Sequence, residues 1–134
     1  MILVACVDDN LGMLFNERRQ SMDSVLRERL LERCQGNKLW MNAYSRKQFD
    51  AAAGGITVNE NFMAKAGAGD YCFAENVSVK PYEKQINKII LYKWNRVYPA
   101  DLYFDIDLKN WRLSKSSDFA GSSHDKITEE IYVK

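Results

Sequence analysis

The sequence has no long apolar segment and no excess of charge of either sign. Its 134 residues include 19 lysines and arginines and 18 aspartates and glutamates, which gives a net charge of +1. A nearly neutral chain produces no overall field that would attract nucleic acid or an anionic membrane. The apolar run Ile2–Val7 has no basic lead and is too short for a signal peptide or a membrane-spanning helix. We therefore expect a cytoplasmic protein whose partners include neither nucleic acid nor a membrane.

Residue types that bind metals or act as nucleophiles are also scarce. The three cysteines, Cys6, Cys34 and Cys72, are widely spaced and form no CxxC motif or Cys/His cluster. This pattern argues against zinc and fits a reducing compartment, so we predict no metal site. His124 is the only histidine and lies in the polar segment AGSSHD. A single histidine in a polar loop argues against a catalytic dyad or triad.

Apolar segments alternate with helical patterns along most of the chain. Strands are expected at residues 2–7, 38–41, 56–58, 71–74, 86–94, 110–119 and 127–133, and helices at about 21–34, 45–53, 60–66 and 78–85. This order predicts an α/β fold with a mainly parallel central sheet, helices on both faces and an antiparallel C-terminal hairpin. The continuous apolar character of 2–7, 71–74 and 86–94 places these strands at the centre. Without repeats or linkers, residues 1–134 are expected to form a single domain.

The first expected helix carries an acidic residue on its apolar face. Ser21 is the expected N-cap, which places Asp23 in the first turn. Leu26, Leu30 and Cys34 share one face at about 100° per residue, and Asp23 falls on the same face. If it is buried, the carboxylate needs a hydrogen-bond partner or a raised pKa. The alternative is an acid that faces water and interacts with the helix dipole.

Motifs near both ends of the chain resemble those of the dihydrofolate reductase family. They are, in chain order, Gly12-Met13, Asp23, Ile89-Ile90-Leu91-Tyr92, Ala100-Asp101-Leu102-Tyr103-Phe104-Asp105, Asp107-Leu108-Lys109-Asn110-Trp111 and Ile131-Tyr132-Val133. These motifs cover only part of the chain, and the resemblance implies that its single domain, residues 1–134, has the fold of that family. It also implies that Asp23 is the catalytic residue, which binds a pteridine ring and supports its protonation while NADPH supplies the hydride.

The sequence departs from that family where the family holds NADPH. Its Gly-Arg-x-Thr segment is replaced by residues 42–46, in which Ser45 and Arg46 are the candidate cofactor-binding residues. Its Gly-Gly pair is replaced by Glu75-Asn76, which puts a carboxylate where the backbone has to approach a diphosphate closely. These changes predict weak NADPH binding or none.

Two further features weaken the expected cofactor site. The stretch between Met41 and Tyr71 is short, so a strand–helix unit that helps to hold the adenosine half is missing. Gly54-Gly55 is expected to be a turn, because no GxGxxG pattern accompanies it. The tryptophan and proline of the family's substrate loop are also absent.

Three hypotheses follow from the sequence. The first is a dihydrofolate reductase-like protein with a degenerate NADPH site, which acts without catalysis as a module that binds a pteridine-like small ligand or a protein. The second is an active NADPH-dependent dihydrofolate or pteridine reductase that uses Asp23 to assist protonation. The third is a different open α/β fold that shares only apolar strands and an acidic turn.

Overall fold

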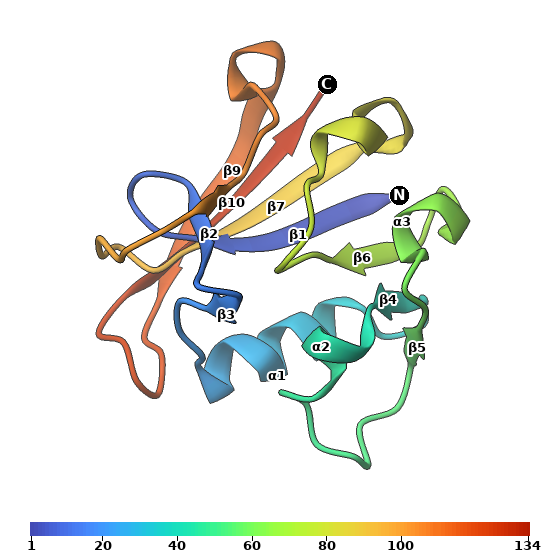
Figure 1. Ribbon diagram of the computed structural model, residues 1–134, viewed down its shortest axis with the longest axis horizontal. Coiled ribbons are helices and arrows are strands. Elements are labelled where there is room, and N and C mark those ends of the chain that lie inside the picture. The colour runs from blue at the N-terminus through green and yellow to red at the C-terminus, as the bar shows by residue number, and fades with distance from the viewer.

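The computed structural model describes residues 1–134 as an α/β fold (Figure 1). The strands are β1 (Ile2–Val7), β2 (Gly12–Phe15), β3 (Arg18–Arg19), β4 (Leu39–Met41), β5 (Ile56–Val58), β6 (Tyr71–Phe73), β7 (Lys88–Lys93), β8 (Leu102–Tyr103), β9 (Arg112–Phe119) and β10 (Ile127–Val133). The α-helices are α1 (Ser24–Arg33), α2 (Ala43–Arg46) and α3 (Phe62–Lys65), and the 3-10 helices are η1 (Lys80–Gln85) and η2 (Leu108–Asn110).

The main sheet contains seven strands in the order β5-β4-β6-β1-β7-β10-β9. The first five in this order pair in parallel, while β10 pairs antiparallel with both β7 and β9. The expected mainly parallel sheet with an antiparallel C-terminal hairpin is therefore confirmed. The three most apolar segments form the adjacent strands β6, β1 and β7 at its centre, since strands covered on both faces need apolar residues at successive positions.

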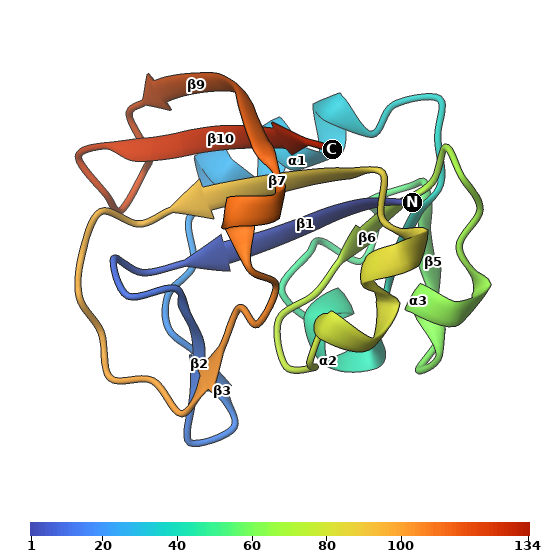
Figure 2. The same cartoon turned by 90° about the horizontal axis from the view of Figure 1, so that it is seen from above.

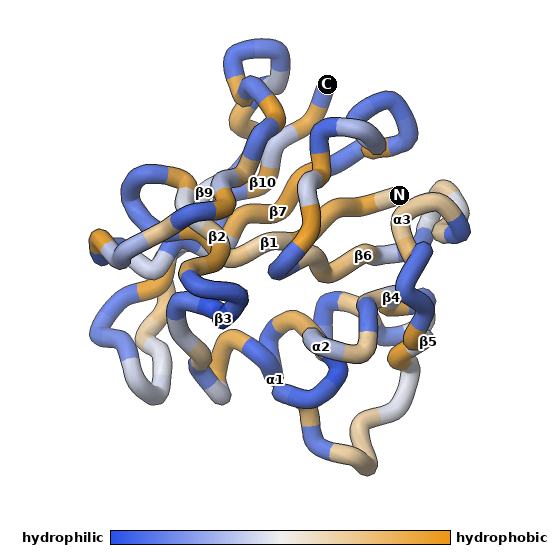
Figure 3. The backbone as a smooth tube through the Cα atoms, viewed as in Figure 1, coloured by the Kyte–Doolittle hydropathy of each residue, from blue (hydrophilic) through white to orange (hydrophobic).

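Helices cover both faces of the main sheet, as expected. Along β1, Val4 belongs to the apolar cluster that contains Leu26 and Leu30 of α1. Its neighbour Leu3 points to the other face and belongs to the cluster that contains Phe62 of α3. Figure 2 shows α1 on one side of the sheet and the two 3-10 helices on the other. In Figure 3 the hydrophobic colouring follows β1 and β7 through the middle of the fold.

A small antiparallel sheet, in the order β3-β2-β8, lies beside the main one. The sequence predicts only a loop over residues 10–16, so this sheet was missed. Asn16 and Glu17 form the two-residue turn between β2 and β3 with φ of 51° and 61°, and positive φ at both positions is what a type I′ hairpin turn requires. The strands are too short to show an alternating pattern, and β8 is remote from β2 in sequence.

Two predicted helices differ from those observed. The helix expected over 45–53 ends at Arg46, whose guanidinium donates to the carbonyl oxygens of Phe49, Asp50 and Ala51 at 3.2, 3.2 and 3.3 Å. These bonds hold the following segment in a non-helical path. The helix expected over 78–85 is the shorter 3-10 helix η1, and Asp105 accepts hydrogen bonds from the N–H groups at its start.

Replacing Leu30 of α1 with alanine tests the packing of this helix. Leu30 is fully buried, so we expect a loss of about 2–5 kcal/mol in the free energy of unfolding through lost contacts and a cavity. Urea denaturation measures the change. The matched control is Leu113→Ala on the exposed strand β9, where the side chain is 47% exposed and the loss is expected to stay below about 1 kcal/mol.

Candidate functional site

Polar residues gather where the central parallel strands end. Asp8 follows β1, Asn42 follows β4 and Glu75 closely follows β6, and all three are buried. The carboxyl ends of parallel strands lie at the same edge of a sheet, where ligands bind in open α/β folds. This carboxyl edge of the sheet is therefore the expected location of a ligand-binding site.

Glu75 forms a two-point ion pair with Arg19 of β3. The Nε and Nη2 atoms of Arg19 donate to the two carboxylate oxygens of Glu75 at 3.0 and 3.2 Å. Tyr44 fixes the other side of the guanidinium, because its ring centroid lies 4.5 Å from Cζ and its backbone oxygen accepts from Nη2 at 3.2 Å. The negative charge of Glu75, at the position of the expected Gly-Gly pair, is thus neutralised by Arg19 from another strand. The sequence does not predict this pairing.

The charges of the Arg19–Glu75 ion pair influence the thiol of Cys6. Burial, followed by the negative charge of Glu75, raises the pKa of the Cys6 thiol well above its usual range. A thiol that stays protonated is a poor nucleophile. Cys6 therefore contributes to packing at this edge and supplies no reactive thiolate.

A cleft of about 300 Å³ opens beside the Arg19 ion pair. It lies between the β2–β3 hairpin and the segment after β7, and its walls include the rings of Phe15 and Tyr98 and the side chains of Arg18 and Gln20. Arg18 is exposed and makes no ion pair, so its charge is available to a ligand. The cleft combines aromatic surface with positive charge.

Asp23 is the N-cap of α1, and its carboxylate is buried. It accepts hydrogen bonds from the backbone N–H groups of Val25, Leu26, Ser122 and Ser123 at 2.8–3.2 Å, and from Nδ1 of His124 at 3.0 Å. The expectation of a buried carboxylate with partners is confirmed. The expectation that Ser21 caps the helix is wrong, because Asp23 holds the cap position and α1 begins at Ser24.

The alternative of a raised pKa for Asp23 is wrong. Burial alone would raise the pKa, but the hydrogen bonds from His124, Ser123, Ser122 and Leu26 outweigh burial and hold it well below its usual range. The carboxylate is therefore ionised at neutral pH, and all of its hydrogen bonds come from the protein. Asp23 also lines an open surface pocket of about 200 Å³ together with Arg27 and Ser123.

His124 lies in a polar loop, as the sequence indicates, but it is buried and has partners on both ring nitrogens. Nδ1 faces the Asp23 carboxylate, and Nε2 lies 3.0 Å from Oγ of Ser21 and 3.4 Å from the hydroxyl of Tyr98. The ring stacks on Trp94 with centroids 4.5 Å apart. These contacts could not be foreseen from the sequence, because folding brings together residues about 100 positions apart and no spacing along the chain signals them.

The predicted cofactor residues lie together in α2. Ser45 is buried, and the cap of this helix is Asn42, whose side chain accepts from the Ser45 N–H at 3.1 Å. The guanidinium of Arg46 is engaged with backbone carbonyls of its own segment. A phosphate that used Arg46 would have to replace these contacts.

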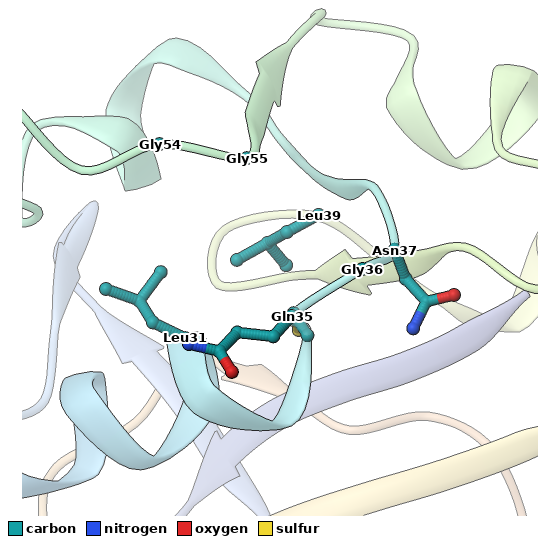
Figure 4. A pocket seen from close by; sticks show the side chains of 8 residues that line it. Leu31, Gln35, Gly36, Asn37, Leu39, Gly54 and Gly55 are labelled. Carbon is teal, nitrogen blue, oxygen red and sulfur yellow. The ribbon is translucent and has the colours of Figure 1, made fainter.

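Another pocket, of about 220 Å³, lies at the opposite end of α1 (Figure 4). Leu31 and Leu39 form its apolar side, and Gly54 and Gly55 lie across from them. Gly55 has φ of +79° and precedes β5, which fits the predicted turn. Burial raises the pKa of the Cys34 thiol in its lining to about 12, so the pocket offers no charged group.

The structure shows neither a metal-binding cluster nor a membrane-spanning helix. No three His, Cys, Asp or Glu residues are grouped so that they could hold a metal ion. None of the helices has the length and apolar composition needed to cross a bilayer.

Comparison with known proteins gives no match, since neither a protein-family model nor a curated protein is similar to this chain.

The depressed pKa of Asp23 predicts an acid-sensitive fold. An unfolded aspartate titrates near about 3.9, so the contribution of Asp23 to stability is complete above that pH and is lost as pH falls toward the lower pKa of the folded state. Asp23→Asn should cost about 2 kcal/mol or more at neutral pH and should flatten this acid dependence. Urea denaturation at a series of pH values measures both effects. Asp125→Asn, in the same loop, is the control and should leave the profile unchanged.

Gly121 is predicted to tolerate no side chain. A Cβ atom at this position would overlap the Asp23 carboxylate, whereas one at Gly69 would meet open space. We expect Gly121→Ala to lower the free energy of unfolding by about 1–3 kcal/mol, and Gly69→Ala to change it by less than about 0.5 kcal/mol. Equal stability of the two variants would show that the loop moves freely away from Asp23.

Proposed function

We propose that this chain is a shortened, divergent dihydrofolate reductase-like protein that binds a small pteridine-like ligand and has no working dinucleotide site. The arrangement of the main sheet supports the resemblance, because the parallel centre and the antiparallel C-terminal hairpin are both features that it implies. Two of the quoted motifs, Ile89–Tyr92 and Ile131–Val133, fall on β7 and β10 of this sheet. Gly12-Met13 and residues 100–105 instead contribute to β2 and β8 of the small sheet.

The Arg19–Glu75 pair is the observation that carries the proposal. It lies at the carboxyl end of β6, where the resemblance would place glycines against the cofactor. Glu75 is 7% exposed and Arg19 is 19% exposed, so a diphosphate could approach only by separating a largely buried, two-point ion pair. Removing Arg19 from Glu75 would also leave a buried carboxylate facing the phosphate.

The cleft beside this pair supports binding of a planar, anionic ligand. Phe15 and Tyr98 offer aromatic faces, and a flat heterocycle stacks favourably on such rings. Arg18 supplies a free guanidinium that pairs well with a carboxylate. A pteridine that carries a carboxylate matches both properties.

The reductase hypothesis requires a different state of Asp23. A proton donor acts best when its pKa is close to the working pH, whereas the hydrogen bonds to Asp23 keep it ionised. The Asp23 carboxylate also accepts hydrogen bonds from four backbone N–H groups and from His124, which occupy its oxygens. These features favour binding without reduction.

Thermal shift and calorimetry with folate, methotrexate and NADPH test the proposal. Folate or methotrexate at 100 times its Kd should stabilise the protein by about 2.7 kcal/mol, and NADPH should give no response. Arg18→Ala should weaken folate binding by about tenfold through loss of the charge pair, while Lys115→Ala on β9 should not.

Two other outcomes would contradict the proposal. Sub-micromolar NADPH binding together with oxidation of NADPH by dihydrofolate would establish the reductase. No response to any of the three compounds would contradict the proposed ligand class.

A further inference from the structure

Ser21, His124 and Asp23 form a connected hydroxyl–imidazole–carboxylate series. Oγ of Ser21 lies 3.0 Å from Nε2 of His124, and Nδ1 of the same ring lies 3.0 Å from Oδ2 of Asp23. We propose that this series is a catalytic centre for ester hydrolysis, with Ser21 as the nucleophile, His124 as the general base and Asp23 as the positioning residue.

The protonation pattern of the series suits this role. The Asp23 carboxylate is ionised and can only accept hydrogen bonds, so His124 must present its N–H at Nδ1. In the neutral imidazole the proton-free nitrogen is then Nε2, which faces the Ser21 hydroxyl. The carboxylate therefore fixes the tautomer in which histidine accepts a proton from serine.

The imidazole is also fixed in orientation. His124 stacks on the ring of Trp94 with an interplanar angle of 27°, and its side chain is only 2% exposed. Four backbone N–H groups hold the Asp23 carboxylate at the other end of the contact. A base held by packing on one side and by an anchored carboxylate on another needs little reorganisation to accept a proton.

The nucleophile is the accessible member of the series. Ser21 is partly exposed, whereas His124 and Asp23 are buried. Tyr98 connects the series to the cleft at the carboxyl edge, because its hydroxyl lies 3.4 Å from Nε2 while the residue forms part of the cleft wall. The backbone N–H groups of Ser21 and Met22 donate to no backbone carbonyl.

The reaction is an acyl transfer to serine followed by hydrolysis. Oγ of Ser21 attacks the ester carbonyl carbon while its proton moves to Nε2 of His124. The tetrahedral intermediate then loses the alcohol, which takes the proton from His124, and leaves an acyl-serine. Water attacks the acyl-serine and gives its proton to His124. Cleavage of the bond to Oγ then releases the carboxylic acid, and the proton returns to Ser21.

The aromatic and basic walls of the cleft define the substrate class. Phe15, Tyr98 and Arg18 favour a small carboxylic ester that carries an aromatic ring or a negative charge. This inference does not depend on pteridine binding, because acylation of Ser21 needs neither folate nor NADPH.

The experiment combines covalent labelling with an ester assay on the full-length chain. A fluorophosphonate reagent should add to Ser21, as located by peptide mass spectrometry, and p-nitrophenyl acetate should be hydrolysed. Ser21→Ala should abolish the label and lower the hydrolysis rate by at least about 100-fold. Ser123→Ala is the matched control, since this serine lies in the loop of His124 and contributes only its backbone N–H to Asp23.

A His124→Gln variant tests the base, and its melting temperature is measured alongside. If the variant folds, Ser21 is still present, but its labelling and the rate of ester hydrolysis should fall to the values measured for Ser21→Ala. If it does not fold, Ser21→Ala decides, since loss of a partly exposed hydroxyl leaves the fold intact. Absence of label on Ser21, or hydrolysis that survives in Ser21→Ala, would overturn the proposal and leave the series with a purely structural role.

Discussion

Five hydrogen bonds converge on the buried carboxylate of Asp23, and three of them come from residues 99 to 101 positions away in the sequence. The carboxylate caps α1 and at the same time holds the loop between β9 and β10 against the start of that helix. Because the group is buried and charged, each missing donor would leave an uncompensated lone pair. The position of Ser21, the orientation of His124 and the closure of the C-terminal hairpin over the helix all depend on this one anchor.

The Arg19–Glu75 pair organises the other half of the carboxyl edge in a comparable way. It joins the small sheet to the end of β6, and the contact of Arg19 with Tyr44 extends the connection to α2. These three elements are thus tied together where a resemblance to dihydrofolate reductases would require open glycine backbone. An ion pair with two good hydrogen bonds resists separation, so it blocks the approach of a dinucleotide to this edge of the sheet.

A short cleft beside the Arg19–Glu75 pair brings aromatic and basic side chains together. Tyr98 belongs to both regions, because it lines the cleft and also reaches Nε2 of His124. Tyr98 is thus the contact between the cleft and the Ser21–His124–Asp23 series. Binding of a small aromatic anion and acyl transfer at Ser21 are chemically compatible uses of the same edge, although neither requires the other.

The sequence by itself determined the mainly parallel sheet, its three central strands and the antiparallel C-terminal hairpin. It did so because burial on both faces forces continuous apolar runs, whereas β10 of the hairpin alternates between buried and partly exposed residues. It also indicated that Asp23 is buried at the start of α1. Only the tertiary structure decided that Asp23 is ionised, that His124 is buried beside Ser21, and that Arg19 neutralises Glu75. Local patterns report which side of an element is buried, but the partners of a buried polar group are set by the folding of distant segments against one another, and that information is absent from spacing along the chain.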